Sequence, residues 1–351
     1  MKKFFQKVSN WELWPFDLMY APLGFVWLYY AIKARSIYFF TPTNPTLIFG
    51  GFEAGSKMEI YQQLPAGSYP NTILIKPTHT TDEIKKKLAA NELSYPFVAK
   101  PDEGMQGVFF RIIESEEELN KYHKIIGVNY IIQTFIDLPM EFSVFYIRYP
   151  GQLKGRVTGF VVKDYLHVNG DGKKTLEQLV NEHPIAQHRL AEMKTKHATN
   201  WLIIPKNGEK YYLSVAGNRS RGARFINLNK EIDQQLNDVF DKLNNYSKSF
   251  FYGRYDLKCS SIENLKTGKD IMILEYNGAG AEPNHIYDCG MSFFKALRII
   301  SAHWRDMYQI GKINNRTGVP YWSFKESLNF RRQLKKDFKE LKKRELELGY
   351  K

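Results

Sequence analysis

Two strand-like runs near the end of the chain decide the fold: Gly253-Arg254-Tyr255-Asp256-Leu257-Lys258 and Ile273-Leu274-Glu275-Tyr276-Asn277-Gly278. Glu275 and Asn277 are two residues apart, so on a strand their side chains point to the same face. Residues 259–270 are long enough for a hairpin loop, which would bring Asp256 on the neighbouring strand to that face. Two carboxylates and an amide suit Mg²⁺, which also binds substrate phosphates. The alternative is that Asp256 and Glu275 are solvated, but both runs are otherwise apolar.

A second constellation lies upstream, where a short apolar strand ends in a lysine. Residues 95–101 read Tyr-Pro-Phe-Val-Ala-Lys-Pro, residues 102–107 form a Gly-containing loop, and residues 108–113 return as a strand. A lysine beside free backbone N–H groups is typical of a phosphate cradle. The pattern is neither a Walker loop nor a dinucleotide fingerprint. A third run, residues 130–136, is followed by Pro139-Met140-Glu141-Phe142-Ser143-Val144.

Together the three runs resemble the ATP-grasp family, of which D-alanine–D-alanine ligase is a familiar member. The family has the same order of parts: a strand ending in Lys-Pro with a Gly-rich loop, a hinge run with a Glu-hydrophobic-Ser/Thr-Val strand, then Asp on one strand and Glu-x-Asn on the next. The resemblance covers about residues 70–300. It implies an α/β ATP-grasp fold in which two α+β lobes clamp ATP, preceded by a short α/β piece.

The resemblance also implies roles for individual residues. Lys100 would contact the phosphates of ATP, with Gln106 and Gly107 in the loop that closes over them. Lys76 is a candidate by position for an earlier lysine, and Glu141 would hold the ribose hydroxyls. The backbone of the hinge would read the adenine edge through Gln133, Thr134, Phe135 and Ile136. The family often has Glu at the position of Gln133, which puts the side-chain contact in question and leaves the backbone contact. The magnesium ligands would be Asp256, Glu275 and Asn277.

Enzymes of this family typically phosphorylate a carboxylate with ATP, and an amine or a thiol then attacks the acyl phosphate. Such chemistry needs cations directed at the charge of the transferring group. Residues 215–225 read Val-Ala-Gly-Asn-Arg-Ser-Arg-Gly-Ala-Arg-Phe, and arginines in such a loop suit a bidentate grip on phosphate or carboxylate. We expect Arg221 first and Arg219 second to act there; the alternative is a solvated basic loop.

Residues 163–179 form a turn-rich loop that leads into a helix, with Thr175 as its expected N-cap and Gln178 three residues later. This segment is similar to the His-Val-x-Gly-Asp-Gly stretch of cyanophycin synthetase and related amino-acid-adding ligases, where it lies near the nucleotide and the acceptor. Lys163 is therefore a candidate for a catalytic phosphate contact and His167 for substrate binding. The alternatives are a surface lysine and an ordinary loop histidine.

A chain of 351 residues suggests two or three subdomains. We expect an aromatic amphipathic segment at 1–36, a short α/β region at 37–90, the ATP-grasp region at 91–310 and a basic helical tail at 311–351. Residues 46–49 and 72–75 read as buried parallel strands. The Gly-rich turn 50–57 between them either binds an anion or simply connects. The loop 278–285 lies where an acceptor should meet the acyl phosphate.

The formal net charge is +13, and residues 324–351 hold ten Lys and Arg against five Asp and Glu. Leu334, Phe338 and Leu341 recur there at helical spacing, so a basic amphipathic helix either docks on the body or is attracted to anionic lipid. The apolar core of the N-terminal segment, residues 18–32, is broken by Pro22 and Gly24 and is short for a bilayer span of about 20 residues. Its dense Trp and Tyr, flanked by Lys and Arg, suit an interfacial segment. It is either a buried helix or a peripheral contact with an anionic membrane surface. No motif indicates a nucleic-acid partner.

The sequence therefore predicts an ATP- and Mg²⁺-dependent carboxylate–amine or carboxylate–thiol ligase acting on small-molecule or lipid-linked substrates. Cys259 and Cys289 have no metal-ligand spacing and argue against a disulfide framework, so we expect a cytoplasmic protein, with peripheral attachment to the inner membrane face as an option. One alternative is a non-catalytic, nucleotide-binding membrane adaptor. Another is a kinase that uses the same site on a hydroxyl compound.

Overall fold

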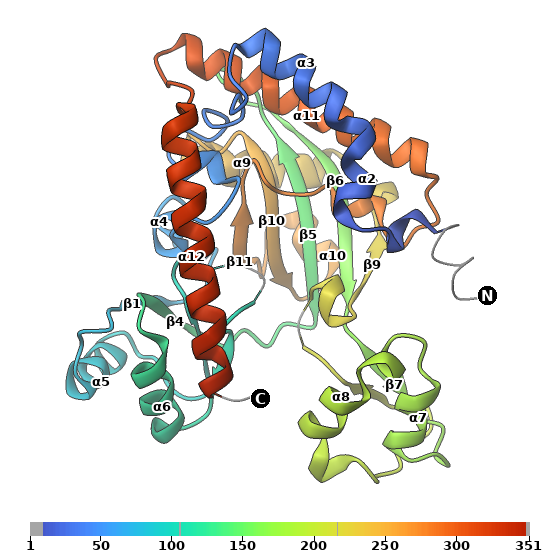
Figure 1. The fold of residues 1–351 in the computed structure, drawn as a ribbon. Helices are drawn as coiled ribbons and strands as arrows, with labels where there is room; N and C mark the ends of the chain where they lie inside the picture. Colours follow the sequence, from blue (N-terminus) through green and yellow to red (C-terminus); the bar gives the residue numbers. More distant parts are fainter. Residues whose placement is uncertain (1–9, 105–106, 216, 349–351) are drawn as a thin grey trace.

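Two antiparallel sheets build two lobes that share a core, and helices cover their outer sides (Figure 1). The computed structural model describes residues 10–104, 107–215 and 217–348. The predicted α+β architecture with two lobes is confirmed. Short 3₁₀ helices lie at Trp11–Leu13, Ala21–Leu23, Ile48–Gly51, Ala186–Arg189, Ala198–Asn200, Arg219–Arg221, Asn229–Glu231 and Asn284–Ile286.

The small lobe is a four-stranded sheet with the order β1 (Thr72–Ile75), β4 (Tyr130–Thr134), β2 (Phe97–Pro101) and β3 (Arg111–Ile113). Its outer face packs on α5 (Thr81–Ala90) and α6 (Glu116–Ile126) through alternate residues such as Phe97, Ala99 and Ile132. Helix α5 begins at a capping box formed by Thr80 and Glu83. The inner face carries Leu74 and Ile131, which join the core of the large lobe.

The large lobe is a five-stranded sheet with the order β11 (Met272–Asn277), β10 (Tyr252–Cys259), β5 (Met140–Ile147), β6 (Arg156–Asp164) and β9 (Arg224–Asn227). One face buries Phe142, Val144, Tyr255 and Leu257 against α9 (Gln234–Ser247) and α10 (Ile262–Thr267). Because side chains alternate along each strand, the residues between these face the other side. That other side carries the polar residues described below.

An insertion between β6 and β9 has its own small core. It consists of β7 (His167–Asn169), β8 (Lys210–Tyr212), α7 (Leu176–Glu182) and α8 (Leu190–Lys196). Helix α7 begins after Thr175, whose capping box with Gln178 confirms the predicted N-cap. Figure 1 shows the insertion below the large sheet, apart from the small lobe.

The N-terminal segment packs on the long helix α11 (Phe293–Arg316) through α2 (Phe16–Tyr20) and α3 (Gly24–Ala34). Trp11, Met19 and Leu23 are buried in this contact. In the described part of the chain, no helix is both long and apolar enough to cross a bilayer. The segment is thus packed on the body along one side, as one of the two sequence readings expects.

The predicted basic C-terminal helix is α12 (Phe324–Leu348), which runs along the left side of the molecule in Figure 1 down to the small lobe. Its apolar side docks on the small lobe through Phe338 and Leu341. Glu345 accepts a hydrogen bond from the Phe109 N–H at 2.8 Å and pairs with Arg111 at 3.2 Å. The apolar side of this helix is therefore occupied by the protein itself.

The two parallel strands predicted at residues 46–49 and 72–75 are not found. Residues 46–49 do not form a parallel strand, because Phe49 and Gly50 have positive φ angles of 52° and 65° that end any extended run. The buried Asn44 side chain holds this turn by donating to the carbonyls of Gly50 and Tyr252 at 3.0 and 2.9 Å. The run 72–75 is a strand, but it pairs antiparallel with β4 and belongs to the small lobe. Helix α4 (Lys57–Tyr61) follows the Gly-rich turn.

Candidate nucleotide and metal site

A polar patch lies on the face of the large sheet that is turned away from α9. In the strand register, Asp256 is opposite both Ser143 and Glu275, and Glu141 is opposite both Lys163 and Lys258. Residues directly opposite on antiparallel strands share a face, with Cβ atoms about 4.5–5.5 Å apart. Asn277 is opposite Arg254 on the same face. The predicted convergence of Asp256, Glu275 and Asn277 on one face is therefore what the strands produce.

Asp256 is the centre of this patch and is 5% exposed. It accepts hydrogen bonds from Ser143, from Arg254 at 3.1 and 3.0 Å and from Asn277 at 3.1 Å, and it lies 3.4 Å from the Lys163 ammonium. Burial alone would raise its pKa, but the adjacent Arg254 and Lys163 charges outweigh burial and hold the pKa well below its usual range. Asp256 is thus a fixed negative charge.

The donor set fits a magnesium ion. Asp256 and Glu275 offer carboxylate oxygens and Asn277 offers its amide oxygen, and hard cations such as Mg²⁺ take oxygen ligands. Among the described residues, no three His, Cys, Asp or Glu side chains are grouped closely enough to hold a metal without other ligands. Two carboxylates and an amide would leave coordination positions for phosphate oxygens or water, which is how Mg²⁺ is usually held.

Glu141 and Lys163 form a buried pair beside Asp256. Their side chains meet at 2.7 Å, and the Tyr165 hydroxyl donates to the other Glu141 oxygen. Burial opposes the charge on Lys163, but attraction to Asp256 and Glu141 exceeds that cost and raises its pKa. A Cβ added at Gly217 would lie 2.6 Å from both Glu141 Oε1 and Lys163 Cδ, so the loop 217–222 passes directly over this pair.

Lys100 reaches the patch from the small lobe. Its ammonium donates to the Leu274 carbonyl at 3.3 Å and lies 3.4 Å from the Tyr61 hydroxyl, beside β11. Burial lowers the pKa of Lys100 to about 8, although Glu275 and Glu141 attract the charge. Gly107 ends the loop that follows Lys100, and a Cβ there would lie 3.8 Å from the Asn218 amide nitrogen. The loops of the two lobes therefore meet above the patch.

Lys57 is a second half-buried lysine at this place, and the sequence argument missed it. It is the first residue of α4, and its ammonium donates to the carbonyls of Pro101 and Asp102 at 3.1 and 3.0 Å. Burial lowers the pKa of Lys57 to about 8, with Glu275 opposing the change and Lys100 adding to it. The sequence offered one signal for Lys57: it is the last residue of the Gly-rich turn 50–57, for which anion binding was one of the two expectations.

The hinge run joins the two lobes after β4. The Gln133 side chain is buried and donates to Thr72 at 2.8 Å, so it serves the small sheet. Thr134 is exposed, while Phe135 and Ile136 are half-buried. Lys258 of β10 donates to the Ile136 carbonyl at 2.9 Å and lies over the Phe135 ring. This contact ties the hinge to the large sheet near Glu141.

The loop arginines make other contacts. Arg219 pairs with Glu12 at 3.0 Å and Asp288 at 3.2 Å, and its guanidinium stacks on the Tyr287 ring. Arg221 lies 3.8 Å from Glu192 in α8. The arginine that does contact the patch is Arg254, which the sequence argument quoted within a strand without giving it a role.

Two further predicted residues lie apart from the patch. Lys76 is exposed just after β1, where its backbone N–H donates to His79. Gln106 lies outside the described residues.

The Gly-rich turn and the loop after β11 lie side by side. The N–H groups of Ala279 and Gly280 donate to the carbonyls of Gly50 and Gly51 at 3.1 and 3.2 Å. A Cβ at Gly280 would lie 2.0 Å from the Phe52 carbonyl oxygen, which explains why small residues stand here. The loop 278–285 is thus held in place directly beyond Asn277.

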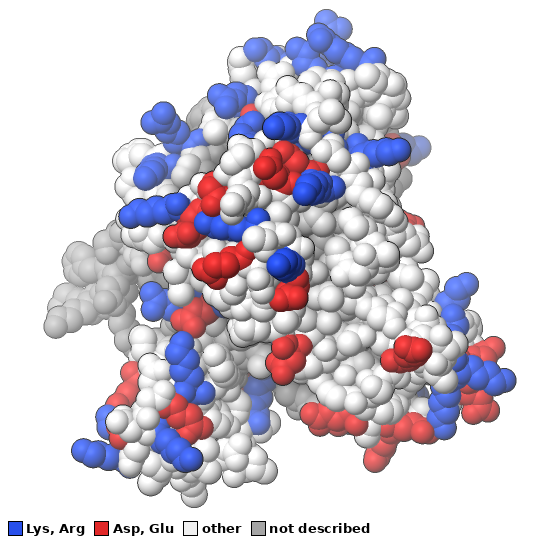
Figure 2. Space-filling model, turned by 180° about the vertical axis from the view of Figure 1, so that it is seen from behind, with Lys and Arg blue, Asp and Glu red and all other residues white. Residues whose placement is uncertain are grey.

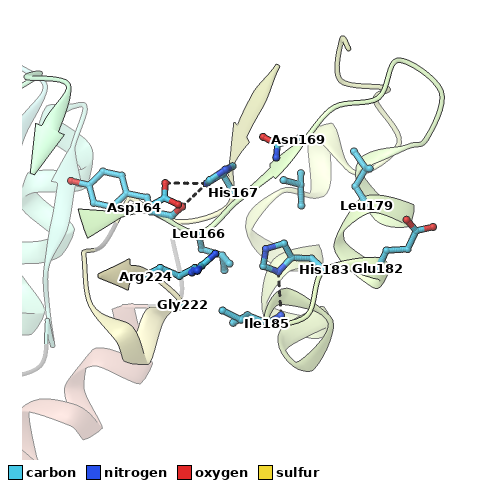
Figure 3. A pocket seen from close by; sticks show the side chains of 12 residues that line it. Asp164, Leu166, His167, Asn169, Leu179, Glu182, His183, Ile185, Gly222 and Arg224 are labelled. Atoms are coloured by element: carbon cyan, nitrogen blue, oxygen red, sulfur yellow. Dashed lines mark hydrogen bonds and ion pairs between the residues drawn. The ribbon is translucent and has the colours of Figure 1, made fainter. Parts of the chain in front are cut away.

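A hollow of about 390 Å³ lies where the insertion meets β6 and β9 (Figure 3). His167 of β7 faces it and lies 3.5 Å from Asp164, and His183 accepts backbone N–H groups through Nδ1. Asp164 is opposite Arg224 in the strand register and one residue from Lys163, so it is on the other side of the sheet from the patch. His167 therefore lies outside the polar patch, whereas Lys163 is part of it.

Comparison with known proteins gives distant similarities, and no family model matches the sequence. Over 137 residues the chain is 28% identical to a glutathione biosynthesis bifunctional protein of Clostridium perfringens, a match that covers 34% of this chain and 18% of the relative. This chain therefore spans less than a fifth of that curated relative.

Three solved structures are similar at low identity. A bifunctional glutathione synthetase from Pasteurella multocida has a TM-score of 0.40 at 14% identity, covering 70% of this chain and 35% of that one. A D-alanine–D-alanine ligase from Bacillus anthracis has 0.40 at 14%, covering 75% and 69%. A D-alanine–D-alanine ligase from Coxiella burnetii has 0.41 at 9%, covering 77% and 61%.

Proposed function

We propose that this chain is an ATP- and magnesium-dependent ligase that joins a carboxylate to an amine, or to a thiol, through an acyl phosphate. The proposal rests on one observation: carboxylates and lysine ammonium groups lie close together at one place between the two lobes. The large sheet presents Asp256, Glu275 and Asn277 beside Lys163, and two half-buried lysines, Lys57 and Lys100, reach them from the other side. Nucleotide phosphates with a divalent cation are the ligands that such a mixed cluster suits.

The metal ion, when bound, would neutralise charge on the transferring phosphoryl group. Asp256 is already held by three donors, so its geometry is fixed before any ligand arrives. Lys57 and Lys100 have lowered pKa values near 8, and phosphate oxygens beside them would favour their charged forms. Glu141 would accept the ribose hydroxyls in place of its contact with Tyr165.

The backbone of the hinge, residues 133–136, would receive the adenine edge beside Lys258. Arg221 and Arg219 are proposed to contact the acyl phosphate when the loop 217–222 rearranges, because Gly217 of the same loop already touches Glu141 and Lys163. Lys163 would contact the phosphates from the sheet side. The substrates would be a small-molecule or lipid-linked carboxylate and an amine that approaches along the loop 278–285, in the cytoplasm where ATP is present.

Thermal unfolding with and without Mg-ATP tests the site. A ligand at a hundred times its Kd stabilises the folded state by about 2.7 kcal/mol, which is readily measured. We expect Glu275→Gln to lose this stabilisation, since its charge would be needed for the metal. Glu117→Gln is the matched control, because Glu117 is an exposed carboxylate on α6. A wild-type protein without any shift would contradict the proposal.

Trapping with hydroxylamine tests the reaction class. An acyl phosphate gives a hydroxamate, whereas a phosphorylated hydroxyl compound from a kinase does not. Incubation with ATP, Mg²⁺ and a pool of carboxylates should therefore release ADP and form hydroxamates in amounts that Glu275→Gln abolishes. ADP release without hydroxamate would instead favour the kinase, and nucleotide binding with no ADP release would favour the adaptor.

A further inference from the structure

Helix α3 has two unlike faces, and one is fully used by the fold. Trp27 packs edge-on against Trp304 at a centroid distance of 5.0 Å, and Tyr30 stacks on Tyr308 at 4.8 Å. Both contact residues belong to α11, and the contacts advance in the same direction along both helices. The two helices are therefore parallel neighbours, as Figure 1 also shows, and α3 is fixed to the body by its aromatic side.

The opposite face of α3 is apolar and open. Phe25 is 81% exposed, Ile32 68%, Leu28 55% and Tyr29 51%. Spacings of three, four and seven residues place these side chains in one stripe on the helix. The preceding turns of the same segment add Leu13 and Leu18, both more than half exposed. Scattered single apolar residues are normal on a protein surface, but a contiguous stripe of this kind marks an interaction site.

A shallow hollow of about 490 Å³ lies beside the stripe, lined mainly by apolar groups of Trp27, Leu28, Ile32 and Ile37. Arg35 also lines it, directly after the end of α3. Arg35 has no ion-pair partner in the described part of the chain and is exposed. An apolar hollow with one free guanidinium at its edge suits a molecule with an apolar chain and an anionic head.

The charge on α3 and α11 has one sign at the surface, and the exposed Asp17 lies before them in α2. Helix α3 contains no acidic residue, and the one in α11 is Asp306, which is buried and paired with Arg156. The exposed cations of α3, its C-cap and α11 are Lys33, Arg35, Lys295, Arg298, Arg305 and Arg316. Figure 2 shows Lys and Arg, and no visible Asp or Glu, along the top rim, where Figure 1 places the ends of α3 and α11.

We propose that the stripe of α3 docks on an anionic phospholipid bilayer, with the helix lying in the plane of the interface. Phe25, Leu28 and Ile32 would enter the outer apolar layer, and Lys33 and Arg35 would meet the headgroups. A second copy of this chain is a poorer occupant. Both copies would bring the same cations, Lys33 and Arg35, to such a contact, and α3 has no acidic residue to pair with them.

The docked face lies close to the loop after β11. The Tyr20 hydroxyl of α2 donates to Glu282 at 2.6 Å, and the same carboxylate accepts from Tyr287 at 3.1 Å. Docking would thus hold the loop 278–285 one helix away from the bilayer. A lipid-linked substrate would follow from this geometry, a consequence that rests on the proposed function, whereas the docking itself does not.

Co-sedimentation of the full chain with vesicles tests the proposal. Wild-type protein should sediment with vesicles of phosphatidylglycerol and phosphatidylcholine and much less with phosphatidylcholine alone. The triple variant Phe25→Ser/Leu28→Ser/Ile32→Ser should weaken binding by about tenfold for each side chain removed. The matched control is Leu153→Ser/Leu202→Ser, which changes side chains that are 78% and 72% exposed elsewhere and should bind as wild type does.

A second variant, Lys33→Gln/Arg35→Gln, leaves the apolar stripe intact and should weaken binding to the anionic vesicles only. Equal thermal unfolding of all variants shows that folding is retained, because the changed residues lie on the open face. Wild-type protein that stays in solution overturns the proposal, as does a triple variant that binds normally. So does sedimentation velocity that gives a wild-type dimer and a monomeric triple variant, since the stripe would then face a second copy.

Discussion

Replacing Asp256 by asparagine tests how the buried charges of the site are held. One carboxylate oxygen accepts from Ser143 and Arg254, and the other accepts from Arg254 and Asn277. An asparagine must turn its NH₂ group towards one of these sets, so a donor would face donors in either orientation. Arg254 and Lys163 would also lose the anion that compensates their burial.

The expected loss is large. Breaking a buried ion pair by removing one partner costs about 3–5 kcal/mol of unfolding free energy. The same charge makes stability depend on pH. Because the folded-state pKa of Asp256 is depressed, its contribution is present above the unfolded pKa of about 3.9 and is lost as pH falls through the folded value. Urea unfolding of wild type and Asp256→Asn at pH 7 measures the difference.

Glu275→Gln is the control that separates stability from binding. Glu275 shares the face with Asp256, but its side chain has no hydrogen bond or ion pair with another described residue. Substitution there removes an attraction to Lys57 and Lys100 but leaves no hydrogen-bond partner unpaired, so it should cost clearly less unfolding free energy than Asp256→Asn while removing Mg-ATP binding. If Asp256→Asn were as stable as Glu275→Gln, the electrostatic account of the patch would be refuted.

Three further outcomes are expected. The pKa of Lys100 is lowered to about 8, so at pH 8.5–9 its amine is mostly neutral and should take up a proton when Mg-ATP binds. Titration calorimetry in buffers of different ionisation enthalpy should show this proton uptake in wild type and less of it in Lys100→Met. Lys57→Met should weaken nucleotide binding at least about tenfold without abolishing folding, as measured by the same calorimetry, whereas Lys76→Met should leave it unchanged. Gly217→Ala should raise the KM for ATP, because the added Cβ would lie 2.6 Å from Glu141 and Lys163. The control Gly24→Ala should leave the KM unchanged, because its Cβ meets nothing within 4 Å. Equal KM values for the two variants would show that the loop moves away in the active form.

The sequence was informative where chemistry and local periodicity coincide. Glu275 and Asn277 had to share a face because a strand repeats every two residues, and a short connection made Asp256 their neighbour. The capped helix after Thr175 followed for a similar reason, since all of its signals lie within four residues. Antiparallel pairing of β10 with β11 needed no long-range information.

Long-range contacts were beyond the same reasoning. Lys57 joins the patch because α4 meets Pro101 and Asp102 far away in the chain, and the Gly-rich turn before it was the one local signal. Arg254 was within reach of the strand pattern, because it lies two residues from Asp256 on the same face of β10. Residues 46–49 look like a strand by composition, yet Asn44 fixes a turn there through carbonyls and N–H groups as distant as Tyr252. Apolar composition cannot report the φ of Phe49, which tertiary contacts impose.

The N-terminal segment shows why one sequence pattern supported two readings. Aromatic residues recur on both sides of α3, so composition was compatible with a buried helix and favoured an interfacial helix only slightly. The structure divides them: Trp27 and Tyr30 are used against α11, and Phe25, Leu28 and Ile32 remain open. Packing of one face of α3 on the body leaves the opposite face accessible for binding. The two readings are therefore compatible, and the basic residues beside the open face favour a lipid partner over a buried one.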